Sequence, residues 1–115
     1  MDNIQGDVVA MLTEAERKGL AEIAADPRVE SYALFTRYGE ELGGNAAESD
    51  LVPVCSNLID IAASFADHLG EEMQCREMAI EGEERDVTIL GLKAMNVVVV
   101  REKGARARGR LSHVD

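Results

Sequence analysis

Apolar residues in the first quarter of the chain recur at helical spacing. Those near one face of a helix over about residues 7–25 are Val8, Leu12, Leu20 and Ile23. Thr13 and Glu16 have the spacing of a capping box, so a packed helix is predicted to begin at Thr13. Asp26-Pro27 ends it, because the residue before proline is pushed out of the helical region. Residues 1–12 are then expected to form a looser N-terminal extension.

Two strand-like segments follow, separated by a glycine turn. Residues 29–36, VESYALFT, are rich in β-branched and aromatic side chains. Gly39 supplies the turn, and residues 40–43 are short enough to return as a second strand. The two segments are therefore predicted to form a hairpin.

A long apolar segment in the middle of the chain predicts a helix of about 20 residues. Ser49 or Asp50 can cap its start, Pro53 suits its first turn, and Gly70 is a natural stop. Its apolar surface is wider than one stripe and comprises Leu51, Val54, Cys55, Leu58, Ile59, Ile61, Ala62, Phe65 and Leu69. A helix packed only on a sheet needs one stripe, so this helix is expected to cover more than one neighbour.

Three further strand-like segments are predicted after this helix. Residues 73–80 alternate weakly between polar and apolar side chains, and residues 87–92 and 95–101 follow after a turn. The four consecutive valines at 97–100 have no polar face, which predicts a central strand that is covered on both sides. The predicted order is helix, two strands, helix, three strands, with residues 73–80 at the outer edge of the sheet.

Charge is distributed unevenly along this chain of 115 residues, whose composition fits one compact globular domain. The net charge is −10, yet residues 1–100 hold 20 Asp and Glu against 7 Lys and Arg, whereas residues 101–115 hold 2 against 5. The acidic body should repel nucleic acid and anionic membranes, so neither is an expected partner.

Targeting signals and cysteine pairs are not evident. The start MDNIQGD lacks the basic and apolar regions of a signal peptide, and no apolar run approaches the roughly 18 residues of a membrane span. A cytoplasmic protein without membrane insertion is predicted. Cys55 and Cys75 have no CxxC spacing and no histidine at ligand distance, so two reduced thiols are expected.

Several polar residues have the types needed for catalysis or metal binding, but their settings favour solvated charges. Asp60, Ser64 and His68 share one helix face, yet a mid-helix serine lacks oxyanion donors. The carboxylates that could hold Mg²⁺ or Ca²⁺ match no ordered ligand spacing; they are Glu71, Glu72, Glu83, Glu84 and Asp86. The sequence therefore predicts no catalytic residue, no metal site and no bound cofactor.

Three segments together resemble the roadblock family of dynein light chains and its prokaryotic relatives. They are LAEIAADPRVESYALFTRYGEELG at residues 20–43, the aliphatic helix at residues 51–69, and MAIEGEERDVTILGLKAMNVVVV at residues 78–100. The resemblance implies an α/β (α+β) chain with a profilin-like roadblock fold of order α-β-β-α-β-β-β. It implies a five-stranded antiparallel sheet with helices on one face. The domain is expected over residues 13–103, followed by a flexible basic tail at residues 104–115.

The resemblance also implies assembly. Family members form homodimers or heterodimers in which the third strand pairs with its counterpart and the second helices pack together. Such a dimer would bury the wide helix surface and remove an exposed strand edge. A homodimer is expected here, and the predicted interface residues are Val54, Leu58, Ile61, Phe65, Met73, Cys75, Glu77 and Ala79.

Function follows from the same resemblance. It implies a non-catalytic dimeric scaffold or regulator in signalling that binds a Ras-like small GTPase and, as in some members, stimulates GTP hydrolysis. Two alternatives remain open: a small-molecule sensor, and a heterodimeric scaffold in a signalling complex without a GTPase. An enzyme that uses His68 or Cys55 has little support. Arg106, Arg108 and Arg110 either keep the tail soluble or contact an acidic partner or the acidic body of this protein.

Overall fold

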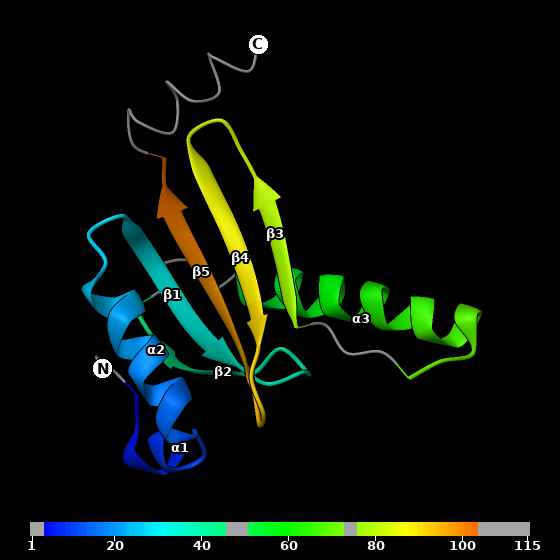
Figure 1. Cartoon of the computed structure of the whole chain (residues 1–115), viewed down its shortest axis with the longest axis horizontal. Coiled ribbons are helices and arrows are strands. Elements are labelled where there is room, and N and C mark those ends of the chain that lie inside the picture. Colours follow the sequence, from blue (N-terminus) through cyan, green and yellow to red (C-terminus); the bar gives the residue numbers. More distant parts are fainter. Residues whose placement is uncertain (1–3, 46–50, 73–75, 104–115) are drawn as a thin grey trace.

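A five-stranded antiparallel sheet forms the centre of the molecule (Figure 1). The computed structural model describes residues 4–45, 51–72 and 76–103. The strand order is β2-β1-β5-β4-β3. The strands are β1 (Val29–Phe35), β2 (Glu41–Gly44), β3 (Glu77–Glu81), β4 (Arg85–Gly91) and β5 (Asn96–Glu102). This sheet confirms the predicted succession of two strands, a helix and three strands.

Three helices accompany the sheet: α1 (Gly6–Ala10), α2 (Glu14–Ala25) and α3 (Leu51–Leu69). The predicted capping box begins α2, since Thr13 Oγ1 accepts from the Glu16 N–H at 3.1 Å and Glu16 Oε1 accepts from the Thr13 N–H at 2.9 Å. At the end of α3, Gly70 has a φ of 70° and donates to the Ala66 carbonyl at 2.9 Å, as a C-terminal glycine should. The expected caps Ser49 and Asp50 lie outside the described residues.

The valine run lies in the central strand, as its lack of a polar face predicts. β5 pairs with β1 on one side and β4 on the other, with Val98 opposite both Ala33 and Ile89. Val97 to Val100 are all buried. Because successive side chains of a strand point to opposite faces, this run supplies both faces of the sheet with core residues.

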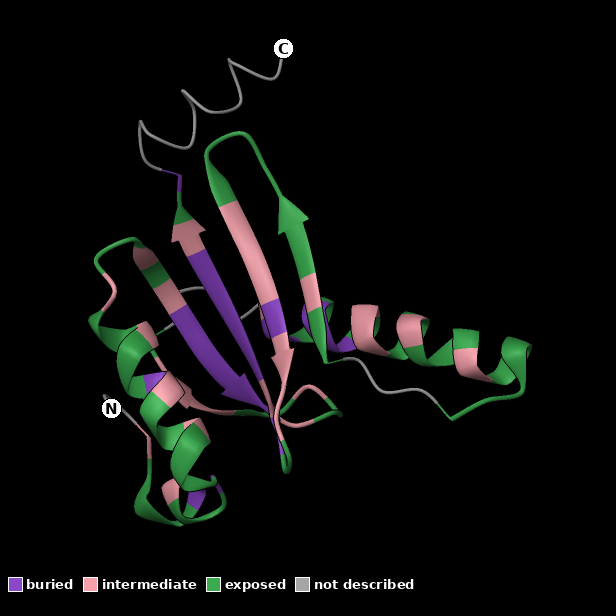
Figure 2. Ribbon diagram, viewed as in Figure 1, coloured by how far each residue is buried: buried purple, intermediate pink, exposed green. Residues whose placement is uncertain are grey.

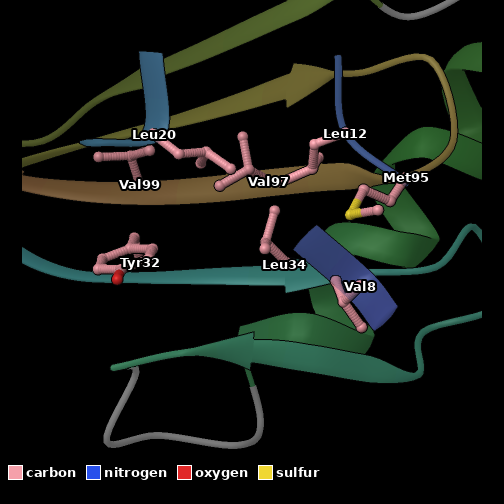
Figure 3. Close-up of a cluster of buried hydrophobic side chains, with 8 residues drawn as sticks. All are labelled: Val8, Leu12, Leu20, Tyr32, Leu34, Met95, Val97 and Val99. Carbon is pink, nitrogen blue, oxygen red and sulfur yellow. The ribbon is translucent and has the colours of Figure 1, made fainter. Parts of the chain in front are cut away.

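One face of the sheet packs against α1 and α2 (Figure 3). The buried cluster there consists of Val8, Leu12, Leu20, Tyr32, Leu34, Met95, Val97 and Val99. Figure 3 shows the Leu20 side chain between those of Val97 and Val99. Val8 and Leu12 come from the segment that was expected to be a looser extension. This segment instead belongs to the core, because its apolar positions continue the face that α2 presents to the sheet.

The opposite face packs against the first half of α3. Its buried cluster consists of Ala33, Phe35, Val52, Cys55, Ile89 and Val98. Ala33 and Phe35 alternate along β1 with Tyr32 and Leu34 of the first cluster, so the two clusters lie on opposite sides. The helices are therefore divided between both faces, where the resemblance had led us to expect them on one. The fully apolar β5 explains the division, because each of its faces needs a cover.

Ion pairs link neighbouring residues at the end of the sheet where β4 begins and β5 ends. Arg85 Nε lies 2.6 Å from Glu30 Oε2, and Lys103 Nζ lies 3.4 Å from Asp86 Oδ1. Lys103 is almost completely buried, although its ammonium group is charged. Within the described ranges, no helix has the length and apolarity to cross a membrane.

Candidate interaction surface

The outer side of α3 carries a row of exposed apolar side chains, which we call the outer stripe. It consists of Val54, Leu58, Ile61, Phe65 and Leu69. Phe65 and Leu69 are each 61% exposed and Ile61 is 59% exposed, whereas Leu58 is half-buried. Figure 2 shows that burial is concentrated at the start of α3 and decreases toward its end. One apolar face of α3 is therefore exposed to solvent, most of all toward the end of the helix.

The spacing of residues along α3 explains why it has two apolar faces. Val52, Cys55 and Ile59 follow one another at three and four residues and face the sheet. The outer stripe repeats at four, three, four and four residues, which places it on a neighbouring side of the helix. Fully burying a large aliphatic or aromatic side chain stabilises a protein by about 1.5–3 kcal/mol, so this row is a strong candidate for a protein interface.

An open groove separates the outer half of α3 from the sheet. Its apolar lining includes Ile59, Ala62, Phe65, Leu69, Met78 and Leu92. Its charged lining consists of Arg37, Asp60, Arg76, Glu77 and Lys93. Small-molecule sites usually enclose most of their ligand, and this groove is open along the helix. The shape favours a protein surface over an enclosed metabolite.

The strand beside this groove is β3, which forms the edge of the sheet as predicted. Among the described strands it pairs with β4 alone, and its other side faces away from the sheet. Met78 packs against the cluster on the α3 side, so Glu77, Ala79 and Glu81 point to the opposite side. Met78 is half-buried and the other residues of β3 are exposed. A free strand edge therefore lies next to an unburied helix.

The structure describes the predicted interface residues of α3 and β3, and of these Leu58 is half-buried because it packs against the cluster beneath α3. Val54, Ile61 and Phe65 are exposed on α3, and Glu77 and Ala79 are exposed on β3. The predicted interface residues Met73 and Cys75 lie outside the described residues, as do the tail residues Arg106, Arg108 and Arg110. Sequence reasoning missed the contributions of the turns, since Arg37 and Lys93 reach the groove only through the fold.

The candidate catalytic residues on α3 do not form a triad. Ser64 Oγ donates to the Ile61 carbonyl at 2.6 Å, and His68 Nδ1 lies 3.0 Å from the main-chain oxygen of Ser64. The hydroxyl and the imidazole therefore each bond to the helix backbone. Cys55 is buried, and desolvation raises the pKa of its thiol, which suppresses the thiolate.

Carboxylate, thiol and imidazole side chains are not gathered into a metal site in the described part of the chain. Within residues 4–45, 51–72 and 76–103, no group of three or more such side chains could hold a metal ion. The chemistry available at this surface is therefore apolar contact, main-chain hydrogen bonding and charge.

Comparison with known proteins gives similar folds but no similar sequences. No protein-family model matches the chain, and no curated protein matches it. A roadblock/LC7 domain from Streptomyces avermitilis has a TM-score of 0.62 at 12% identity, covering 72% of this chain and 73% of the domain. Gliding protein MglB from Thermus thermophilus has a TM-score of 0.61 at 16% identity, covering 84% and 80%. An MglB with a tetrameric arrangement has a TM-score of 0.60 at 12% identity, covering 97% and 88%.

These likenesses establish the class of fold. Each covers more than two thirds of both chains, and each is to a protein of the family that the sequence resembles. The chain has the roadblock/LC7 fold.

Proposed function

We propose that this protein is a dimeric scaffold, without catalytic activity of its own, that binds and regulates a Ras-like small GTPase in the cytoplasm. The observation that carries the proposal is the outer stripe of α3 lying beside the free edge of β3. An isologous dimer would bury both features at once, because the same patch is used twice across a two-fold axis.

The contacts of the proposed dimer follow from this arrangement. Val54, Leu58, Ile61 and Phe65 of one protomer pack against the same residues of its partner, while β3 of each protomer lies at the junction of the two sheets. Burial of the stripe removes apolar surface from water, and strand pairing satisfies main-chain groups that a free edge leaves to solvent. Met73 and Cys75 precede β3 and are proposed to flank the same interface.

The GTPase partner is proposed from the roadblock resemblance together with the fold. Two of the similar structures named above are MglB proteins, one with a tetrameric arrangement, which supports assembly as a property of chains with this fold. The basic residues Arg106, Arg108 and Arg110 are proposed to contact an acidic partner surface.

Regulation of a GTPase is tested with a panel of purified prokaryotic Ras-like GTPases, whose rates of GTP hydrolysis are measured with and without this protein. Unchanged rates, together with no co-elution with any member of the panel, contradict the proposal.

The dimer is tested by light scattering on the wild type and on Phe65→Asp. A carboxylate placed in a buried helix contact is left without a partner, so this variant should be a folded monomer where the wild type is a dimer. Ser64→Asp is the matched control, since it adds the same charge one residue away on the polar side of α3. A monomeric wild type, or equal masses for wild type and Phe65→Asp, would rule out the proposed interface.

A further inference from the structure

The free edge of β3 carries a regular pattern of negative charge. Glu77 and Glu81 lie at the two ends of the strand, on the same side, with Ala79 between them. Both glutamates are exposed. Among the described residues, neither glutamate forms an ion pair.

Cations close to Glu81 are already engaged elsewhere. Arg85 is paired with Glu30 at 2.6 Å, and Lys103 is paired with Asp86 at 3.4 Å. The residue directly opposite Glu81 on β4 is Asp86, which is itself a carboxylate. Glu77 lies opposite Leu90 on β4, and among the described residues neither Arg76 nor Lys93 forms an ion pair with it. The edge therefore offers unneutralised carboxylates to any strand that approaches it.

Pairing of β3 with its own copy would place like charges together. A two-fold axis perpendicular to the sheet makes the two copies antiparallel, and full overlap of this five-residue strand centres the pairing on Ala79. Glu77 of one protomer then lies opposite Glu81 of its partner, and the symmetry repeats this contact at the other end. Like charges directly opposite each other destabilise an antiparallel pair.

We propose that the β3 edge selects a partner strand with lysine or arginine at the two positions facing Glu77 and Glu81, and that it binds its own copy less tightly. This inference rests on the proposed function, because it requires a dimer that includes β3. Charge complementarity at the two ends of the strand supplies the selectivity, while the outer stripe supplies apolar contact that does not distinguish partners. The fitting partner is a second chain of this fold with a basic edge strand.

The wild type and its own charge-swapped variant provide the test. Glu77→Lys/Glu81→Lys converts the edge into a basic strand while α3 and the rest of the sheet stay unchanged. The variant is mixed with an equal amount of wild type, and native mass spectrometry counts the dimers. Random pairing would make half of the dimers mixed, so we expect the mixed dimers to be clearly more than half. The mixed dimer should form about tenfold more tightly than either parent dimer.

A single substitution gives an independent measurement. Glu77→Lys places the introduced lysine opposite Glu81 of the partner at both ends, so sedimentation should show a self-association constant about tenfold higher than that of wild type. High salt should reduce this gain, because exposed charges are screened. Glu22→Lys, which makes the same charge change on the exposed side of α2, should leave self-association unchanged.

Two results would overturn the inference and leave the proposed dimer standing. One is random mixing of wild type and the doubly substituted chain; the other is an equal gain from Glu77→Lys and Glu22→Lys, which reports net charge alone. If neither the wild type nor any of these variants self-associates, and the wild type is a monomer in light scattering, both the proposed dimer and this inference are wrong.

Discussion

The carboxylate of Glu16 accepts a 2.8 Å hydrogen bond from the main-chain N–H of Lys93, although the two residues are far apart in the sequence. The other oxygen of Glu16 accepts from the N–H of Thr13 at 2.9 Å. One side chain thus caps α2 and also holds the turn between β4 and β5. Because that turn lines the groove beside α3, the start of α2 helps to position the candidate interaction surface.

Glu16→Ala removes both hydrogen bonds and leaves the N–H groups of Thr13 and Lys93 without this partner. We expect the free energy of unfolding to fall by about 1–2 kcal/mol, as for loss of a helix cap together with one further hydrogen bond. Urea denaturation followed by circular dichroism measures the change. Glu22→Ala, on the exposed side of the same helix, is the control and should change stability by less than half as much.

The contribution of Glu16 should also depend on pH. Partial burial raises the pKa of its carboxyl, but hydrogen bonds from Thr13 and Lys93 outweigh burial and hold the pKa below its ordinary value. A group whose pKa is lower in the folded state stabilises the protein above its unfolded pKa, which is about 4.3 for glutamate. This stabilisation is lost as the pH falls through the folded pKa.

Comparison of wild type with Glu16→Gln measures this dependence. The difference in unfolding free energy should be constant near neutral pH and should shrink as the pH drops below about 4.3. A difference that stays the same down to acidic pH would show that charge on Glu16 has no part in the contact.

Gly44 should tolerate no side chain. Its φ is 121°, and an added Cβ would lie 2.8 Å from the Cα of Ala33 and even closer to the carbonyl oxygen of Tyr32. Gly44→Ala should therefore destabilise the fold by about 2–3 kcal/mol and displace β2 from β1. Thermal unfolding gives the stability, and amide exchange along β1 reports the strand pairing.

Gly19→Ala is the matched glycine control, because nothing lies within 4 Å of a Cβ built at Gly19 in the middle of α2. Alanine is favoured over glycine inside a helix, so this variant should be stabilised by about 0.5–1 kcal/mol. A loss of stability at Gly19 together with no loss at Gly44 would contradict the geometry described for both sites.

The ion pair between the buried Lys103 and the partly exposed Asp86 gives a further prediction. The Lys103 side chain is 6% exposed, and Asp86 is its partner at 3.4 Å. Lys103→Ala removes the packed stem and the charge together and should destabilise the protein by about 2 kcal/mol. Lys103→Met retains the stem, so the loss measured by urea denaturation should be about half as large. If both variants lose the same amount, packing of the stem contributes nothing.

Local patterns predicted most of the elements because their causes are local. The Thr13 and Glu16 capping box, the stop at Gly70 and the unbroken valines of β5 each depend on residues close in the chain. The wide apolar surface of α3 also predicted an exposed row, since two rows at helical spacing cannot both face one sheet.

The sequence by itself determined the order of α2, α3 and the five strands, the edge position of β3 and the central position of β5. Only the tertiary structure decided that α1 and α2 cover one face while α3 covers the other, that Val8 and Leu12 belong to the core, and that the N–H of Lys93 bonds to Glu16. The physical reason is the range of the interactions. Periodicity and caps act within a few residues, whereas the choice of a face and the meeting of two turns depend on which distant surfaces bury each other.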